Sequence, residues 1–152
     1  MVLKIISGGQ TGADRAALDF AMAHNIAHGG KCPKGRLAED GKLNPKYQLT
    51  ETSEAEFIHR TRANILESDG TVIFTHGPLQ GGSRVTADYA ARREKPCLHL
   101  DLKAFPIKEA AKHLQKWIRE NKIRVLNVAG PRASHAPMIY RLVTQTLIAS
   151  FA

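Results

Sequence analysis

The sequence lacks the features of several large protein classes. No apolar run approaches the roughly 20 residues that a membrane-spanning helix needs. The N-terminus has no small-residue cleavage pattern, so we read no signal peptide. Cys32 and Cys97 are the only two cysteines, too few for a disulfide framework. We therefore expect a cytoplasmic protein without a membrane segment.

Standard cofactor and metal motifs are also missing. The chain has neither the Gly-Lys-Ser/Thr of a P-loop nor a Gly-x-Gly-x-x-Gly dinucleotide fingerprint. It has seven histidines, but none stands in a His-Glu-x-x-His or Cys-x-x-Cys type of ligand spacing. No Ser-His-Asp order or nucleophile elbow can be drawn. We therefore predict no metal site and assign no catalytic residue.

Aromatic residues are scarce, at 6% of the chain, while the net charge is +8. A basic chain first suggests nucleic acid as a partner. However, the lysines and arginines form no block of five or more, and aromatics do not alternate with them as in stacking platforms. We favour a scattered basic surface over nucleic-acid binding. The alternative is that some of these cations line a pocket for a small anion.

What is present is an alternation of strands and helices in a chain of 152 residues, the length of a single domain spanning 1–152. This order predicts an α/β, Rossmann-like, doubly wound and mostly parallel sheet flanked by helices. Strands are expected at 2–6, 27–30, 48–50, 71–75, 97–100 and 123–128. Helices are expected at 13–23, from a Ser53 N-cap to about 69, at 83–94, from Pro106 to about 118, and at 138–150.

Glycine-rich turns follow three of these strands. Glycine lets a backbone approach a ligand closely, and the free amides and dipole of the next helix favour an anion there. The turns share the carboxyl edge of a parallel sheet, where such folds bind ligands. A long loop at 31–47 leaves from the same edge, and loops of this length are usually functional. The predicted ligand-binding residues are Gly8, Gly9, Gln10, Thr11, Gly12, Lys34, Gly35, Arg36, Gly81, Gly82, Ser83, Thr86, Gly130 and Arg132.

Each group of residues also has a purely structural reading. The first glycine turn is compatible with any tight strand-to-helix connection, and Ser83 is compatible with a plain N-cap. Asp14 is read as a helix cap in preference to a partner of Arg15. Lys34 and Arg36 are as compatible with a solvated loop as with anion recruitment, whereas Arg132 offers bidentate geometry to a phosphate.

Four stretches together resemble the molybdenum cofactor carrier family, a branch of the lysine decarboxylase-like, LOG-related group. They are Ile5-Ile6-Ser7-Gly8-Gly9-Gln10-Thr11-Gly12-Ala13-Asp14-Arg15, Gly29-Gly30-Lys31-Cys32-Pro33-Lys34-Gly35-Arg36, Gly77-Pro78-Leu79-Gln80-Gly81-Gly82-Ser83, and Leu126-Asn127-Val128-Ala129-Gly130-Pro131-Arg132. The resemblance implies a Rossmann-like fold, homo-oligomers (a dimer or tetramer) and binding of molybdenum cofactor, a phosphorylated pterin that carries molybdenum on a dithiolene. A molybdoenzyme would then be the acceptor of the cargo.

The related phosphoribohydrolases, which release a base from a nucleoside 5′-monophosphate, supply an alternative function. Their motif is Pro-Gly-Gly-x-Gly-Thr-x-x-Glu, and the matching stretch here runs from Gln80 to Asp88. Proline is replaced by Gln80, the later glycine by Arg84, threonine by Val85 and glutamate by Asp88. A carboxylate survives, one methylene shorter, so we favour a binding protein for a phosphorylated small molecule over an enzyme that uses Asp88 with Arg84 or Arg15.

Overall fold

A computed structural model describes all residues from Met1 to Ala152. Its centre is a five-stranded sheet in the order β2-β1-β9-β7-β8, in which every neighbouring pair is parallel. The strands are β1 (Lys4–Ile6), β2 (Ala27–Gly29), β7 (Gly70–Thr75), β8 (Cys97–Asp101) and β9 (Val125–Ala129). The prediction of a Rossmann-like α/β fold with a mostly parallel sheet is confirmed.

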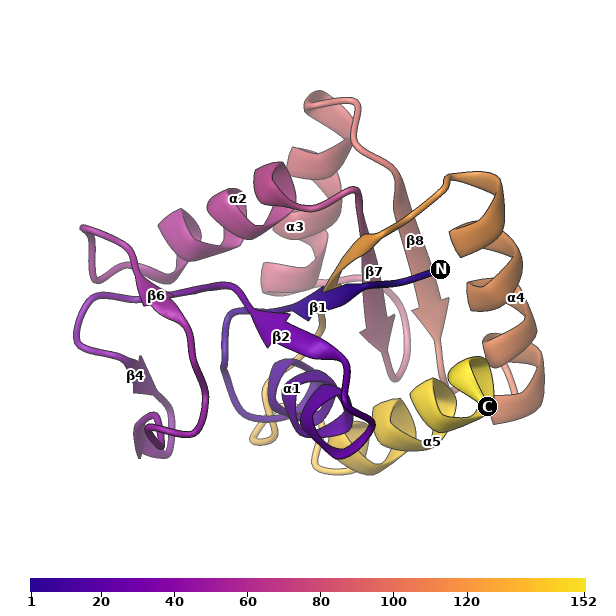
Figure 1. Cartoon of the computed structure of the whole chain (residues 1–152), viewed down its shortest axis with the longest axis horizontal. Coiled ribbons are helices and arrows are strands. Elements are labelled where there is room, and N and C mark those ends of the chain that lie inside the picture. The colour runs from indigo at the N-terminus through magenta and orange to yellow at the C-terminus, as the bar shows by residue number, and fades with distance from the viewer.

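The chain has five helices, and they flank the sheet (Figure 1). Helix α5 (Ile139–Phe151) packs against both α1 (Ala13–Ala23) and α4 (Ile107–Glu120), and α2 (Phe57–Glu67) packs against α3 (Gly81–Arg92). The main core joins the sheet to α1, α4 and α5 and includes Phe74, Leu126 and Leu147, all fully buried. None of the helices combines the length and apolarity that crossing a bilayer requires.

The strand order creates a switch point in the middle of the sheet. From β1 the chain crosses to β2 at one edge, whereas from β7 it crosses to β8 at the other edge. The last strand of the chain, β9, lies between β1 and β7. Loops that follow β1, β7 and β9 therefore leave the same end of three adjacent strands in diverging directions. This is the arrangement that opens a ligand crevice in doubly wound sheets.

Residues 31–47 are more ordered than the predicted loop. They contain β3 (Lys31–Cys32), which pairs with β6 (Thr50–Glu51), and a small hairpin of β4 (Leu37–Ala38) and β5 (Gly41–Lys42). A second hydrophobic cluster anchors this segment to α1. Its members are Leu18, Cys32, Leu43, Tyr47 and Leu49. The missed signal is that Leu43, Tyr47 and Leu49 are large apolar residues in a polar segment and bury together in one cluster.

Two predicted helix starts are wrong. Helix α2 begins at Phe57, so Ser53 is not its N-cap, and Glu56 in the cap position makes no side-chain bond to the helix. Helix α3 begins at Gly81 rather than at Ser83. Gly81 enters the helix with φ of +55°, a conformation that glycine adopts without strain. The two glycines that appeared to belong to the turn therefore form the first turn of α3.

Strand β9 begins two residues later than predicted because of Asp69. The Asp69 carboxylate accepts hydrogen bonds from the amides of Arg124 at 2.9 Å and Val125 at 2.8 Å. These two bonds hold the pKa of Asp69 below its usual value, and the bond from Val125 has the larger effect. The Asp69 side chain thus takes the amides of Arg124 and Val125, while the Arg124 carbonyl accepts the amides of Leu3 and Lys4.

We predict that Asp69→Asn lowers the free energy of unfolding by about 1–2 kcal/mol at pH 7, because a neutral amide oxygen is a weaker acceptor than a carboxylate. The pKa of Asp69 is lower in the folded protein. Its stabilisation is therefore complete above the unfolded-state value of about 3.9 and disappears as the pH falls through the folded-state value. Urea denaturation from pH 7 to pH 3 measures this, with Asp88→Asn on an exposed face as the control. A difference between wild type and variant that stays constant over that range would contradict the assignment.

Candidate functional site

A cavity of about 480 Å³ lies at the carboxyl ends of β1, β7 and β9, closed on one side by α2. Cavities of several hundred Å³ are typical of small-molecule sites. The walls come from four parts of the chain that are distant in sequence. The lining includes Gln10 and Asp14 after β1, Phe57 and Arg60 on α2, Gly82 and Ser83 on α3, and Arg132 after β9.

The N-terminus of α3 offers the cavity its free donors. The amides of Gly81, Gly82 and Ser83 make no hydrogen bond within the chain, and no side chain caps the helix. The Ser83 hydroxyl also has no partner, whereas the Thr86 hydroxyl donates to the Gly82 carbonyl at 2.9 Å. Unpaired amides and the positive end of the helix dipole together make a place where an anion is stabilised.

The loop that leads into α3 is held by side chains of β8. The Thr75 hydroxyl donates to the Gly77 carbonyl at 2.6 Å, so its oxygen accepts the Nε2–H of His99 at 2.7 Å. The Gly77 amide donates to the Asp101 carboxylate at 2.7 Å. Burial lowers the pKa of His99, which favours the neutral ring, and the bond to Thr75 then fixes its proton on Nε2. The entry to α3 is therefore fixed before any ligand arrives.

The first glycine turn, in contrast, uses most of its donors internally. The Gly9 amide donates to the Ser7 hydroxyl, the Gln10 amide to the Asp14 carboxylate and the Thr11 amide to the Gln10 side chain. The amide of Ala13, at the start of α1, donates to the Pro131 carbonyl at 3.3 Å. The two turns look alike in sequence but differ in this respect: three consecutive amides, from Gly9 to Thr11, are bonded in the first, whereas three consecutive amides, from Gly81 to Ser83, are unbonded in the second.

Two arginines hold the carbonyls of that first turn. Arg60 is 8% exposed and donates to the Gly8 carbonyl at 2.6 Å, and its Nη1 lies 3.8 Å from the Asp14 carboxylate. Arg15 donates to the Gly9 carbonyl at 3.1 Å and forms a bidentate pair with Asp40. Burial raises the pKa of Asp14, and the charge of Arg60 opposes that shift. Arg60 thus supplies the countercharge that keeps a buried carboxylate in this wall.

The Nε2 atom of Gln10 is the one buried side-chain nitrogen or oxygen that has no hydrogen-bond partner in the chain. The residue lines the cavity and is 5% exposed. Its Oε1 is occupied, because it accepts the amides of Thr11 at 3.0 Å and Glu39 at 2.8 Å. Buried donors are nearly always satisfied in folded proteins, so an orphan in a cavity wall points to a bound guest or an ordered water.

The predicted site residues fall into two groups. Those that line the cavity are Gly8, Gln10, Gly81, Gly82, Ser83, Thr86, Gly130 and Arg132. Outside its lining are Gly9, Thr11, Gly12, Lys34, Gly35 and Arg36. Gly9 and Gly12 have positive φ, and a side chain at Gly12 would meet the Pro131 carbonyl at 2.4 Å. Backbone conformation and close packing therefore explain why glycine occupies positions 9 and 12.

The basic pair of the 31–47 segment does not face the cavity. Arg36 donates to the carbonyls of Asn44, Tyr47 and Leu49, and so stabilises its own segment. Lys34 is exposed and makes no salt bridge. Arg132 does line the cavity, with its guanidinium carbon 5.4 Å from the centre of the Phe57 ring. Of the three predicted countercharges, only Arg132 lies where an anion at α3 can meet it.

Sequence reasoning missed Arg60, Phe57 and Asn127 as cavity residues. Arg60 and Phe57 are on α2, a helix whose amphipathic pattern gave no sign of ligand contact. The buried Asn127, on β9, donates to the Thr71 hydroxyl at 3.1 Å and was read only as part of a strand. A polar residue inside an otherwise apolar strand, as in Leu126-Asn127-Val128, is the signal that could have identified it.

The carboxylate required by the hydrolase alternative lies elsewhere. Asp88 and Arg84 are exposed on α3, pair with each other at 3.5 Å and do not line the cavity. Arg15 is engaged with Asp40 and Gly9. The residues proposed for base release therefore do not converge on the cavity.

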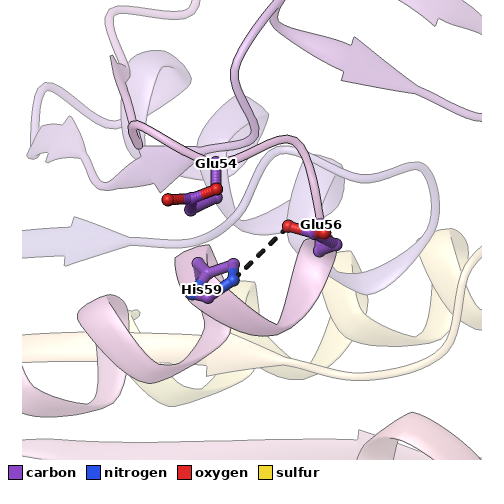
Figure 2. Close-up of side chains that lie close together, drawn as sticks. All are labelled: Glu54, Glu56 and His59. Atoms are coloured by element: carbon purple, nitrogen blue, oxygen red, sulfur yellow. Dashed lines mark ion pairs between the residues drawn. The ribbon is translucent and has the colours of Figure 1, made fainter.

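One group of side chains has the spacing of a metal site. Glu54, Glu56 and His59 face one another at the start of α2, and their ligand atoms lie within 4.8 Å of one another (Figure 2). All three are exposed, and His59 and Glu56 form an ion pair at 3.4 Å. Exposed clusters of this kind are common without an ion, and we assign no metal to this one.

Comparisons with known proteins agree with this architecture. A crystal structure at 1.45 Å of a "Putative molybdenum carrier protein" from Syntrophus aciditrophicus is 50% identical in sequence, with a TM-score of 0.98. The alignment covers 99% of this chain and 96% of that one. No curated protein matches. The family model described as "Circularly permutated YpsA SLOG family" matches residues 5–151.

The predicted likeness to a molybdenum carrier of the LOG-related group is confirmed by both matches. The position of the last strand, β9, between β1 and β7 suits a description as circularly permuted, because the centre of the sheet comes from the end of the chain. The chain belongs to the circularly permuted YpsA family of the SLOG group.

Proposed function

We propose that this protein is a carrier that binds a phosphorylated small molecule, with molybdenum cofactor as its cargo. The observation that supports this most is the set of free amides of Gly81, Gly82 and Ser83 in a cavity that also contains Arg132. A phosphate at this position would accept two or three backbone hydrogen bonds and lie at the positive end of α3.

The cavity residues fit the cofactor's chemistry. Its molybdenum is held by its own dithiolene, so the cavity needs no metal ligands and has no cysteine in its lining. The terminal phosphate matches the α3 amides, and the flat pterin matches the exposed edge of Phe57, which is 36% exposed. The cargo would leave through the open mouth to a molybdoenzyme acceptor. A homo-oligomer, as in the related family, would present several such cavities.

A carrier explains the engagement of the only carboxylate in the cavity lining better than an enzyme does. The carboxylate in the cavity wall, Asp14, is held by the Gln10 amide and lies beside Arg60. General acid–base chemistry needs a group that can reach the substrate proton. Asp14 is instead committed to the first turn, so binding without turnover is the function that the geometry favours.

We predict that Gly82→Asp weakens binding of inorganic phosphate and of the cofactor at least tenfold, because it places a carboxylate at the amides that would hold the phosphate. The fold should persist: no atom lies within 4 Å of a side-chain carbon added at Gly82. An acidic residue in the first turn also favours the helix. Titration calorimetry measures the affinity, and circular dichroism the fold.

The matched control is Gly82→Asn, which adds a side chain of the same size without charge. We expect it to lose much less affinity than Gly82→Asp. Equal losses would mean that shape alone explains the effect. Unchanged affinity in both variants would place the phosphate elsewhere and remove the α3 site.

We further expect the freshly purified protein to retain a phosphorylated guest. Native mass spectrometry should show an added mass that acid denaturation releases, and oxidation of the released material should give a fluorescent pterin. Asp88→Asn should carry the same mass, since Asp88 lies outside the cavity. Incubation with AMP should release no adenine above a blank. Released adenine, together with loss of release in the Asp88 variant, would instead favour the hydrolase.

A further inference from the structure

We propose that Gln10 selects the ligand by donating a hydrogen bond from Nε2 to an uncharged oxo group on a planar heterocycle, and that Glu39 is the positioning residue that aims it. This inference rests on the proposed function, because it assumes that the α3 amides hold the phosphate of the same molecule. It assigns the other end of the cavity, at the carboxyl end of β1, to recognition of the ring.

The orientation of the Gln10 amide follows from its partners. Two backbone N–H groups, of Thr11 and Glu39, point at one atom of the amide. A flipped side chain would place its own NH₂ group against both donors, so the atom between them must be the carbonyl oxygen. The NH₂ group is therefore fixed on the opposite side, buried and without a partner in a cavity wall. It can make a hydrogen bond only to a water molecule or to an acceptor on a bound ligand.

Glu39 holds this arrangement from the hairpin of β4 and β5. Its carboxylate accepts the hydroxyls of Thr11 and Ser134 and the Ser134 amide. It thereby joins the first turn, the hairpin and the loop after β9. With its carboxylate anchored, the backbone N–H of Glu39 stays directed at the Gln10 oxygen, 2.8 Å away. The exposed hairpin thus controls a donor in the cavity that it does not itself line.

The surroundings of Gln10 indicate which acceptor would suit it. The nearby wall contains the Asp14 carboxylate, which Arg60 balances at 3.8 Å. A second anionic group there would meet an uncompensated repulsion, whereas an oxo group or ring nitrogen would not. The guanidinium groups of Arg60 and Arg132 lie over the Phe57 ring, at 5.1 and 5.4 Å from its centre, so this part of the wall combines an aromatic ring with two planar cations. The ligand class that fits is a phosphorylated, flat heterocycle that carries an oxo group.

Both a pterin and an oxopurine have this chemistry, so the test uses a matched pair of probes for each. The first pair is GMP and 2-aminopurine riboside 5′-monophosphate, which lacks the oxo group. The second is 6-hydroxymethylpterin and its 4-amino analogue, in which an amine replaces the oxo group. Calorimetry gives the ratio of dissociation constants within each pair, and inorganic phosphate is titrated separately into the wild type.

We expect the wild type to bind the oxo member of at least one pair about tenfold more tightly than its partner. The pair that shows this preference identifies the heterocycle. Gln10→Glu should abolish the preference, because it keeps the oxygen that faces Thr11 and Glu39 and turns the donor into an acceptor. Glu39→Gln should reduce the preference to a smaller ratio by loosening the orientation of Gln10. Asp88→Asn, outside the cavity, should retain the wild-type ratio. Circular dichroism checks that each variant is folded.

The outcomes separate this inference from the proposed function. If inorganic phosphate binds but neither pair is discriminated, or if Gln10→Glu retains the preference, the role of Gln10 is overturned and the phosphate site stands. If no phosphate-bearing probe binds the wild type, both proposals fail. If the ratio of dissociation constants is unchanged in Glu39→Gln, Glu39 has no positioning role, and Gln10 alone recognises the oxo group.

Discussion

The cavity depends on the buried guanidinium of Arg60. This one side chain connects α2 to the first turn through the Gly8 carbonyl and compensates the buried Asp14 carboxylate. Removing a single partner from a buried ion pair is costly because it leaves the other charge unpaired. A side-chain carbon added at Gly8 would meet Arg60 at 2.3 Å, so the turn and the arginine are fitted to each other. The rest of the wall, including Gln10, is built on that contact.

The two strand–turn–helix junctions, after β1 and after β7, are similar in sequence but differ in how their backbone groups are hydrogen-bonded. In the junction after β1, arginines hold the carbonyls of Gly8 and Gly9, and the amides from Gly9 to Thr11 are bonded by Ser7, Asp14 and Gln10. The junction after β7 is open, because the chain enters α3 at Gly81 with no capping side chain. Glycine allows close packing in the first junction and leaves amides unbonded in the second. One end of the cavity is thus a wall of bonded backbone groups, and the other presents free amides.

Much of this architecture could be predicted from the sequence. The alternation of buried strands and amphipathic helices gave the parallel sheet, and the glycines after β1, β7 and β9 gave the edge at which the cavity opens. The division of labour between the two turns could not be predicted, because it depends on whether an amide is already bonded. Asp14 and Gln10 satisfy amides of the first turn from within it, but Arg60 comes from a helix some fifty positions away, and Glu39 from a hairpin. No local pattern marks such contacts.

The position of β9 in the sheet has a consequence for how the protein folds during synthesis. This strand separates β1 from β7 and contributes Asn127 to the cavity wall, yet it leaves the ribosome after both of its neighbours. Until it inserts, the strands on its two sides have no common ladder. A chain interrupted before β9 would keep both glycine turns but lack the strand that joins them. The cavity is in this way completed only after β9 has been made.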